Sequence, residues 1–121
     1  MKKLTIGVVG AGIYGNYHIH TYCCDKNVER VVFCDLNEER RIATADKYQI
    51  TGYKTVKEMI AQEQLDAISI ATPDPYHFEP AKDAMEAGIK YLFIEKPLAT
   101  SVKECEELIA LAEKHGVKIS V

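Results

Sequence analysis

Residues 6–18 read IGVVGAGIYGNYH, and this stretch decides the fold. An apolar run leads into Gly10, Gly12 and Gly15, which form the pattern G-x-G-x-x-G, and a helical segment begins near Ile13. Gly10 permits a tight turn, Gly12 lets a ligand approach the backbone, and Gly15 lets the helix pack closely on the strand. A strand, a glycine-rich turn and a helix in this order predict the opening unit of a parallel sheet.

The same alternation continues along the chain. Apolar runs that barely alternate with polar residues predict strands buried on both faces, at 4–9, 30–34, 51–54, 67–70, 91–94 and 117–121. Helical patterns separate the runs, one beginning near residue 13 and the others at 38–48, 56–61, 77–87 and 102–115. Alternating strands and helices with short loops predict an α/β fold, a doubly wound parallel sheet of the Rossmann type with about six strands and helices on both faces.

Two helices carry clear start and stop signals. Asn37 is the expected N-cap of the segment at 38–48, and Ser101 opens a capping box before the segment at 102–115, which ends at Gly116. The last helix is also expected to bury a stripe made of Val102, Cys105, Leu108, Ile109 and Ala112.

Length and composition bound the class of protein. The 121 residues suffice for one domain, expected to span 1–121. A net charge of −3 with no basic block argues against a nucleic-acid partner. No apolar run approaches the roughly 20 residues that a membrane span needs. The four cysteines include no C-x-x-C pair, which is typical of free thiols in the reducing cytoplasm.

Doubly wound sheets bind ligands at the carboxyl ends of their strands, so the residues that follow each strand are the candidates for function. After the first strand, the free N–H groups near Ile13 and Tyr14 and the helix macrodipole predict a site for a pyrophosphate. Asp35 ends the second strand, twenty residues after Gly15, and completes the fingerprint of a dinucleotide-binding unit.

Asp35 also bears on the choice of cofactor. Its carboxylate is expected to accept hydrogen bonds from the adenosine ribose hydroxyls, whereas a 2′-phosphate about 4 Å away would be repelled by on the order of 4 kcal/mol at an effective dielectric of ~20. NAD is therefore favoured over NADP. Arg40 and Arg41 leave NADP open, because both are within reach of a 2′-phosphate. The alternative role of Asp35 is to cap the next helix, for which Asn37 is better placed.

The fourth strand runs into the sequence ISIATPDPYHFEP, residues 68–80. Ala71, Thr72 and Pro73 are expected at the edge of the sheet, beside the nicotinamide half of a dinucleotide. Asp74 either contacts that ribose or stabilises the turn. His77 either faces the site or caps the next helix, and we favour the cap.

The fifth strand ends in an unusual way, in YLFIEKPLAT at residues 91–100. Lys96 follows the strand on the same edge as the glycine loop, where a cation would polarise a carbonyl or stabilise an alkoxide during hydride transfer. Pro97 would fix the backbone, with a cis Lys96–Pro97 bond as one option, and Glu95 would pair with Lys96 or cap a neighbouring group. The alternative for this segment is a surface ion pair at a strand end.

A metal site is not expected. His18, His20, Cys23 and Cys24 lie close together in sequence, but on a helix His18 and His20 point about 200° apart and cannot share an ion.

The chain resembles the glucose–fructose oxidoreductase / inositol dehydrogenase (Gfo/Idh/MocA) family. Four stretches carry the resemblance: GVVGAGIYGNYH, CDLNEERR, LDAISIATPDPYH and AGIKYLFIEKPLATS, at 7–18, 34–41, 65–77 and 87–101. The resemblance implies that Lys96 is a catalytic residue contacting the reacting hydroxyl and that its bond to Pro97 is cis. It also implies that the nicotinamide end is lined by Thr72, Pro73 and Glu95, and the ADP half by Gly10, Gly12, Ile13, Tyr14 and Asp35.

Members of this family carry a second, larger domain that shapes the substrate pocket, often supplies a general base and makes most oligomer contacts. We therefore expect residues 1–121 to be the cofactor domain alone, with poor turnover or none, from a homo-oligomeric dehydrogenase of a sugar, polyol or related hydroxy compound. The alternative is a dinucleotide-binding redox sensor without catalysis. Lys96 distinguishes the two, because a sensor has no use for it.

Overall fold

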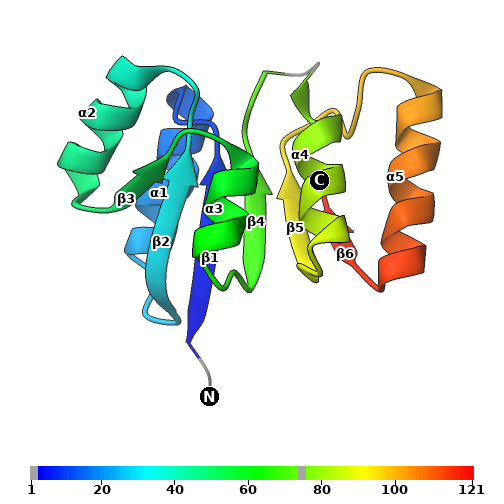
Figure 1. Ribbon diagram of the computed structural model, residues 1–121, viewed down its shortest axis with the longest axis horizontal. Helices are drawn as coiled ribbons and strands as arrows, with labels where there is room; N and C mark the ends of the chain where they lie inside the picture. The colour runs from blue at the N-terminus through cyan, green and yellow to red at the C-terminus, as the bar shows by residue number, and fades with distance from the viewer. Residues whose placement is uncertain (1–2, 74–75) are drawn as a thin grey trace.

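The computed structural model describes residues 3–73 and 76–121, in which six strands alternate with five helices (Figure 1). In chain order they are β1 (Leu4–Val9), α1 (Ile13–Cys23), β2 (Val28–Cys34), α2 (Glu38–Tyr48), β3 (Thr51–Tyr53), α3 (Val56–Gln62), β4 (Ala67–Ile70), α4 (Phe78–Glu86), β5 (Tyr91–Ile94), α5 (Val102–His115) and β6 (Lys118–Ser120).

All paired strands are parallel, and their order in the sheet is β3-β2-β1-β4-β5-β6. The chain winds from β1 outward to β3 and then returns to β4 on the other side of β1. The winding direction therefore reverses between β1 and β4, which is where doubly wound sheets bind ligands. This topology confirms the predicted Rossmann fold. In Figure 1 the strands point upward, so their carboxyl ends form the upper rim.

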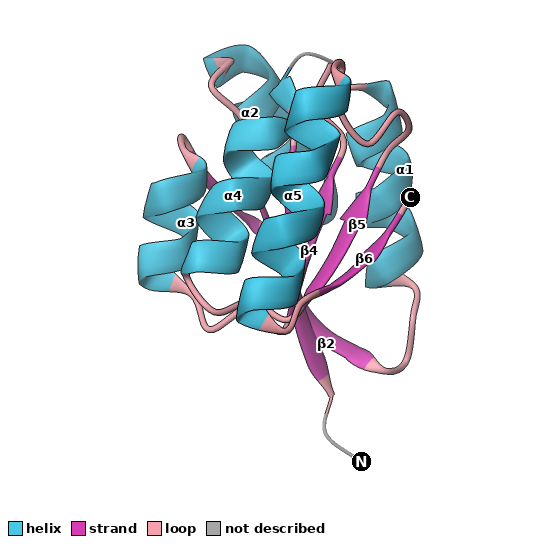
Figure 2. Cartoon of the chain, turned by 90° about the vertical axis from the view of Figure 1, so that its right-hand side faces the viewer, coloured by secondary structure: helices cyan, strands magenta, loops and turns pink. Residues whose placement is uncertain are grey.

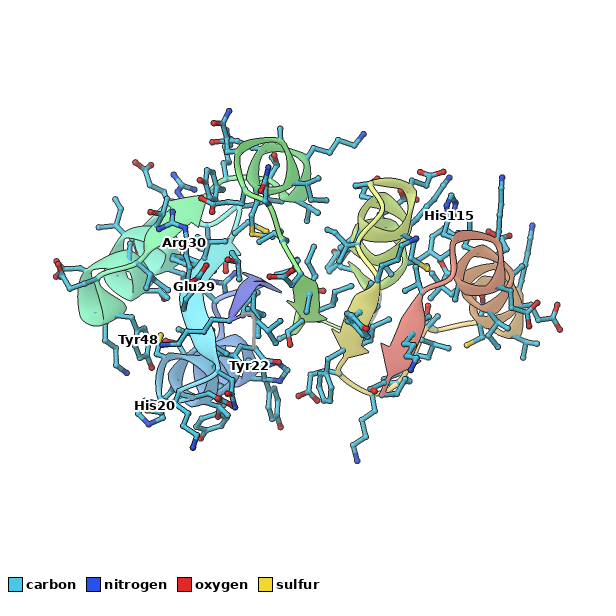
Figure 3. All side chains as sticks on the ribbon, turned by 90° about the horizontal axis from the view of Figure 1, so that it is seen from below. His20, Tyr22, Glu29, Arg30, Tyr48 and His115 are labelled. Carbon is cyan, nitrogen blue, oxygen red and sulfur yellow. The ribbon has the colours of Figure 1, made fainter. Side chains whose placement is uncertain are left out.

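Helices cover the sheet on both faces, as predicted. On one face α1 and α2 bury a cluster that includes Val8, Ile19 and Phe33. On the other face α3, α4 and α5 bury a larger cluster that includes Met59 and Leu108. Figures 2 and 3 show α1 on the opposite side of the sheet from these three helices.

The expected caps are present. The side chain of Asn37 accepts a hydrogen bond from the N–H of Arg40 at 2.9 Å, and Ser101 accepts one from the N–H of Glu104 at 3.1 Å. Gly116 ends α5 in the left-handed region, at φ 66°. These local signals explain why α2 and α5 have the predicted bounds.

The predicted apolar stripe of α5 is partly wrong. Leu108 is fully buried, but Val102 is 74% exposed and Ile109 is 51% exposed. Packing against the main core instead uses Cys105, Leu111 and Ala112 beside Leu108. The helix lies over the β5–β6 end of the sheet and beside α4, so only a narrow side of it meets apolar neighbours.

The prediction that the strands are buried on both faces is wrong for β5 and for the edge strands β3 and β6, which contain no buried residue. Leu92 and Ile94 are buried beneath α4 and α5, but Tyr91 and Phe93, which alternate with them, are 56% and 38% exposed on the other face. The helices on that face, α1 and α2, lie over the β1, β2 and β3 half of the sheet and leave β5 largely uncovered.

Among the described residues, no helix has the length and apolar character needed to cross a membrane.

Candidate functional site

The glycine loop between β1 and α1 is shaped by close backbone contacts. Gly10 has φ 96°, and its N–H donates to the carbonyl of Cys34 at 2.9 Å. A Cβ at Gly15 would lie 1.8 Å from the carbonyl oxygen of Gly10, so the helix touches the turn itself. A Cβ at Gly12 would meet nothing within 4 Å. The packing of the fold therefore requires glycine at position 15, whereas position 12 faces open space.

Asn16 holds this loop and was missed by the sequence analysis. Its side-chain amide donates to the carbonyls of Ala11 and Gly12 at 2.7 and 2.9 Å. The signal was weak, because an asparagine in the first turn of a helix is common. These bonds fix the carbonyls of the loop and leave the N–H groups at the start of α1 directed toward the rim.

Asp35 follows β2 and is 9% exposed. One carboxylate oxygen accepts from the N–H of Ala11 at 2.8 Å, and the other accepts from the N–H of Asn37 at 2.8 Å. The carboxylate therefore ties the glycine loop to the second loop of the rim. The helix that begins at Glu38 is capped by Asn37 rather than by Asp35.

The two arginines of α2 behave differently. Arg40 lies beside the Asp35 carboxylate, with Nε 3.3 Å from Oδ2, and its side chain is 56% exposed. Arg41 donates to the backbone carbonyl of Asp35 at 3.1 Å and does not line the cavity described below. Of the two, Arg40 is therefore the cation available to a ligand at this end of the rim.

The loop after β4 closes against the glycine loop. The N–H of Ala71 donates to the carbonyl of Val9, and a Cβ at Gly10 would lie 3.1 Å from backbone atoms of Ala71. Asp74 lies outside the described residues. The winding reversal thus brings Ala71 and Thr72 directly beside the glycine turn.

The turn after β5 contains the lysine. Glu95 continues the ladder, donating its N–H to the carbonyl of Ile70 at 2.9 Å, and the Lys96–Pro97 bond is cis. The side chain of Glu95 lies 2.6 Å from Nε2 of His18 on α1, and among the described residues it forms no ion pair with Lys96. Glu95 therefore contacts a neighbouring histidine, the second of the two options for this residue. Lys96 is exposed.

Both roles predicted for His77, facing the site and capping the next helix, are wrong. Its side chain is fully buried and makes no capping bond at the start of α4, so it neither faces the cavity nor caps the helix. Its ring instead lies between two loops, with Nδ1 2.7 Å from the carbonyl oxygen of Pro97 and Nε2 2.8 Å from that of Thr72. Sequence gave no sign of this, because the partners are backbone carbonyls on separate segments.

A single cavity of about 1530 Å³ collects most of the candidates. Its lining includes Gly10, Gly12, Ile13, Tyr14, Asp35, Ala71, Thr72, Pro73, Glu95 and Lys96. Of the predicted residues that the structure describes, three do not line it, namely Gly15, His77 and Pro97. It is also lined by Leu36, which directly follows the acid and is 72% exposed, a position that the sequence analysis passed over.

Cys34 also lines this cavity, but its thiol has low reactivity. Burial, followed by the negative charge of Asp35, raises the pKa of its thiol to about 12. The thiol therefore stays protonated at neutral pH and is a poor nucleophile. Among residues 3–73 and 76–121, no three His, Cys, Asp or Glu side chains gather closely enough to hold a metal ion.

These residues fit a nicotinamide dinucleotide. The open space over Gly12 leaves room for a pyrophosphate at the start of α1, and Asp35 at the end of β2 presents a carboxylate to the ribose end. Lys96 supplies a cation after β5, which lies on the other side of β1 from β2. The cavity exceeds the 300–1,000 Å³ typical of small-ligand sites, as an extended ligand requires.

Comparison with known proteins agrees with this geometry. The model of an oxidoreductase family with an NAD-binding Rossmann fold (GFO_IDH_MocA) matches residues 4–121. An inositol 2-dehydrogenase/D-chiro-inositol 3-dehydrogenase of Shouchella clausii is 33% identical over 117 residues, covering 94% of this chain and 34% of that protein. A UDP-N-acetylglucosamine 3-dehydrogenase of Acidithiobacillus ferrooxidans is 31% identical, covering 100% of this chain and 37% of that protein.

Solved structures give the same result. GenD2 from gentamicin A biosynthesis, in complex with NAD, matches with a TM-score of 0.91 and 27% identity over 99% of this chain and 34% of that chain. Myo-inositol 2-dehydrogenase from Lactobacillus plantarum matches with a TM-score of 0.89 and 30% identity over 98% of this chain and 36% of that chain. The present chain thus spans about a third of the length of the relatives it matches. It belongs to the Gfo/Idh/MocA oxidoreductase family and corresponds to that family's NAD-binding Rossmann domain.

Proposed function

We propose that this chain is the cofactor-binding domain of a longer oxidoreductase that transfers hydride between NAD and a hydroxyl-bearing carbon of a sugar, polyol or related compound. The observation that carries the proposal is the joint lining of one cavity by Gly12, Asp35 and Lys96. The relatives named above are dehydrogenases of inositols and of a nucleotide sugar, which supports the class of substrate.

Different residues along the cavity bind different parts of the cofactor. The loop at Gly10, Gly12, Ile13 and Tyr14 binds the pyrophosphate, and Asp35 binds the adenosine ribose. Thr72, Pro73 and Glu95 line the nicotinamide end. When bound, the cofactor accepts hydride from the carbon that bears the hydroxyl group, and the oxygen loses its proton as the carbonyl forms.

Lys96 acts on that oxygen. Its ammonium group donates a hydrogen bond to the oxygen as negative charge develops there, and in the reverse direction it polarises the carbonyl. The released proton needs a base, which we assign to a second domain that also completes the substrate pocket and the contacts of a homo-oligomer. Residues 1–121 alone would then bind NADH without turnover. We place the protein in the cytoplasm, which its free cysteines support.

The direct test is a survey of substrates with the full-length protein. Cyclic polyols, sugars and nucleotide sugars are added with NAD, and formation of NADH is followed by absorbance. Oxidation of at least one of these classes is expected. Saturable binding of NADH without oxidation of any of them would overturn the dehydrogenase assignment and favour the redox sensor.

The preference for NAD is tested at Asp35. Replacing Asp35 with Asn removes the charge that repels a 2′-phosphate and weakens the hydrogen bonds to the ribose hydroxyls. Arg40 remains beside the site. We expect the ratio of NADPH to NADH affinity to rise at least tenfold, a conservative fraction of the repulsion of about 4 kcal/mol at an effective dielectric of ~20. Fluorescence titration of residues 1–121 with each cofactor measures the ratio.

The matched control for Asp35→Asn is Glu29→Gln, which neutralises an exposed acid at the amino end of the same strand (Figure 3). It should leave both affinities unchanged. Because Asp35 also holds the N–H groups of Ala11 and Asn37, some loss of affinity for both cofactors is expected. An equal loss for NADH and NADPH would remove the argument for specificity.

A further inference from the structure

The turn that carries Lys96 is held from both faces of the sheet by histidines. His18 belongs to α1 and contacts Glu95, the residue before the lysine. His77 lies at the start of α4, on the opposite side of the sheet, and contacts Pro97, the residue after it. The lysine itself is exposed, so its position depends on its two neighbours.

His77 contacts two acceptor groups on separate segments. Both ring nitrogens face backbone carbonyl oxygens, at 2.7 and 2.8 Å, and a carbonyl oxygen only accepts hydrogen bonds. A neutral imidazole carries one N–H, so it bonds one of these carbonyls and presents a lone pair to the other. In either tautomer the ring fills the space between the loop at Thr72 and the turn at Pro97 and fixes their separation.

His18 contacts the turn through one ring nitrogen. Its Nε2 lies 2.6 Å from the carboxylate of Glu95, and its buried Nδ1 has no hydrogen-bond partner in the part of the chain that the structure describes. A ring with one proton, on Nε2, donates to Glu95 and leaves no N–H unpaired. The ring packs edge-on against Phe93 at a centroid distance of 5.3 Å and against Tyr22 at 6.2 Å, which fixes its orientation.

We infer that His18 and His77 are positioning residues that together set the place of Lys96 relative to the nicotinamide end of the cavity. His18 holds Glu95 through its Nε2, and the ring of His77 lies between the carbonyl groups of Pro97 and Thr72. Because Thr72 lines the cavity and Pro97 adjoins the lysine, His77 fixes the spacing between the cofactor loop and the catalytic turn. The inference rests on the proposed catalytic role of Lys96.

His18 contacts one group of the turn and His77 contacts two groups on separate loops, and this difference predicts which replacements restore function. The side-chain amide of glutamine reaches Glu95 as Nε2–H does, so His18→Gln should keep kcat within about threefold, whereas His18→Leu should lower it about tenfold or more. A glutamine at position 77 donates from a single nitrogen and cannot span two carbonyls. His77→Gln and His77→Ala should therefore both lower kcat by about ten- to a hundredfold.

Binding and stability controls separate positioning from general damage. The affinity of all four variants for NADH should change less than threefold, because neither histidine lines the cavity. Ile19→Ala and Met85→Ala remove fully buried side chains from the same two helices without touching the turn. They should lower the melting temperature without lowering kcat at 25 °C.

Ring-nitrogen NMR of residues 1–121 tests the geometry without any assay of activity. We expect a slowly exchanging ring N–H signal from both His18 and His77, because each ring contacts a fixed hydrogen-bond acceptor. Rapid exchange of the ring proton in either histidine, or rescue of kcat by His77→Gln, would overturn the inference. If Lys96→Met itself leaves kcat unchanged, the proposed function fails. If Lys96→Met abolishes turnover while the histidine variants do not lower kcat, only the positioning role fails.

Discussion

Replacing Lys96 with methionine is expected to lower kcat for hydride transfer by about 10²–10³-fold, while the affinity for NADH changes less than threefold. Methionine keeps the length and most of the volume of lysine but removes the charged donor. The loss follows from the position of the amine, which borders the cavity where an alkoxide would form, and removal of one such donor costs roughly 3–4 kcal/mol in the transition state. Steady-state kinetics of the full-length protein, together with fluorescence titration of NADH, measure both quantities.

Lys103→Met is the matched control, because Lys103 is exposed on α5 and does not line the cavity. It should leave kcat and NADH affinity unchanged. Lys96→Arg tests geometry rather than charge. Arginine keeps the cation but spreads it over a planar group, so we expect it to recover only part of the activity. A Lys96→Met protein with the original kcat would rule out the proposed role of the lysine.

Alanine at Gly15 and at Gly12 should give opposite defects. At position 15 the new Cβ would lie 1.8 Å from the carbonyl oxygen of Gly10 and 2.7 Å from its carbonyl carbon, both backbone atoms that cannot move aside without opening the turn. Overpacking of this kind costs about 1–3 kcal/mol or more, and exceeds the gain of about 1 kcal/mol from replacing a helical glycine with alanine. We expect the melting temperature to fall by about 10 °C or the chain not to fold.

At position 12 the same change should leave the melting temperature within about 2 °C, because the Cβ would meet nothing within 4 Å. It should nevertheless weaken NADH binding at least tenfold, since the methyl group occupies the space through which the pyrophosphate approaches the backbone. Thermal denaturation and NADH titration of residues 1–121 measure both variants. Unchanged NADH affinity in Gly12→Ala would mean that the pyrophosphate does not lie over this loop.

The elements of the fold could be read from the sequence because their signals are local. The helices at 38–48 and 102–115 have the predicted bounds, since Asn37, Ser101 and Gly116 act on backbone groups within three or four residues of themselves. The strands were found as apolar runs, and the two errors have one cause. Tyr91 and Val102 are apolar residues whose exposure depends on which neighbouring element covers them, and no local pattern records that.

The residues of the candidate site also include some that the sequence predicted and some that it did not. Gly12, Asp35 and Lys96 were placed by their positions after β1, β2 and β5, because the carboxyl ends of parallel strands share one edge. Asn16, Leu36 and the roles of the two histidines were not found. His18 and Glu95 are 77 residues apart, and they meet only because α1 packs over the face of the sheet on which β5 is otherwise open.

The sequence by itself determined the periodic elements, their order and therefore the sheet, together with the loops that can hold a dinucleotide. These follow from hydrogen bonding and burial within single elements and from the restricted handedness of the crossovers. Only the tertiary structure decided that Gly15 touches the turn, that Arg40 rather than Arg41 borders the cavity, and that His77 is a buried link between two loops. Such contacts join segments far apart in the chain, and their geometry is fixed by how the layers pack.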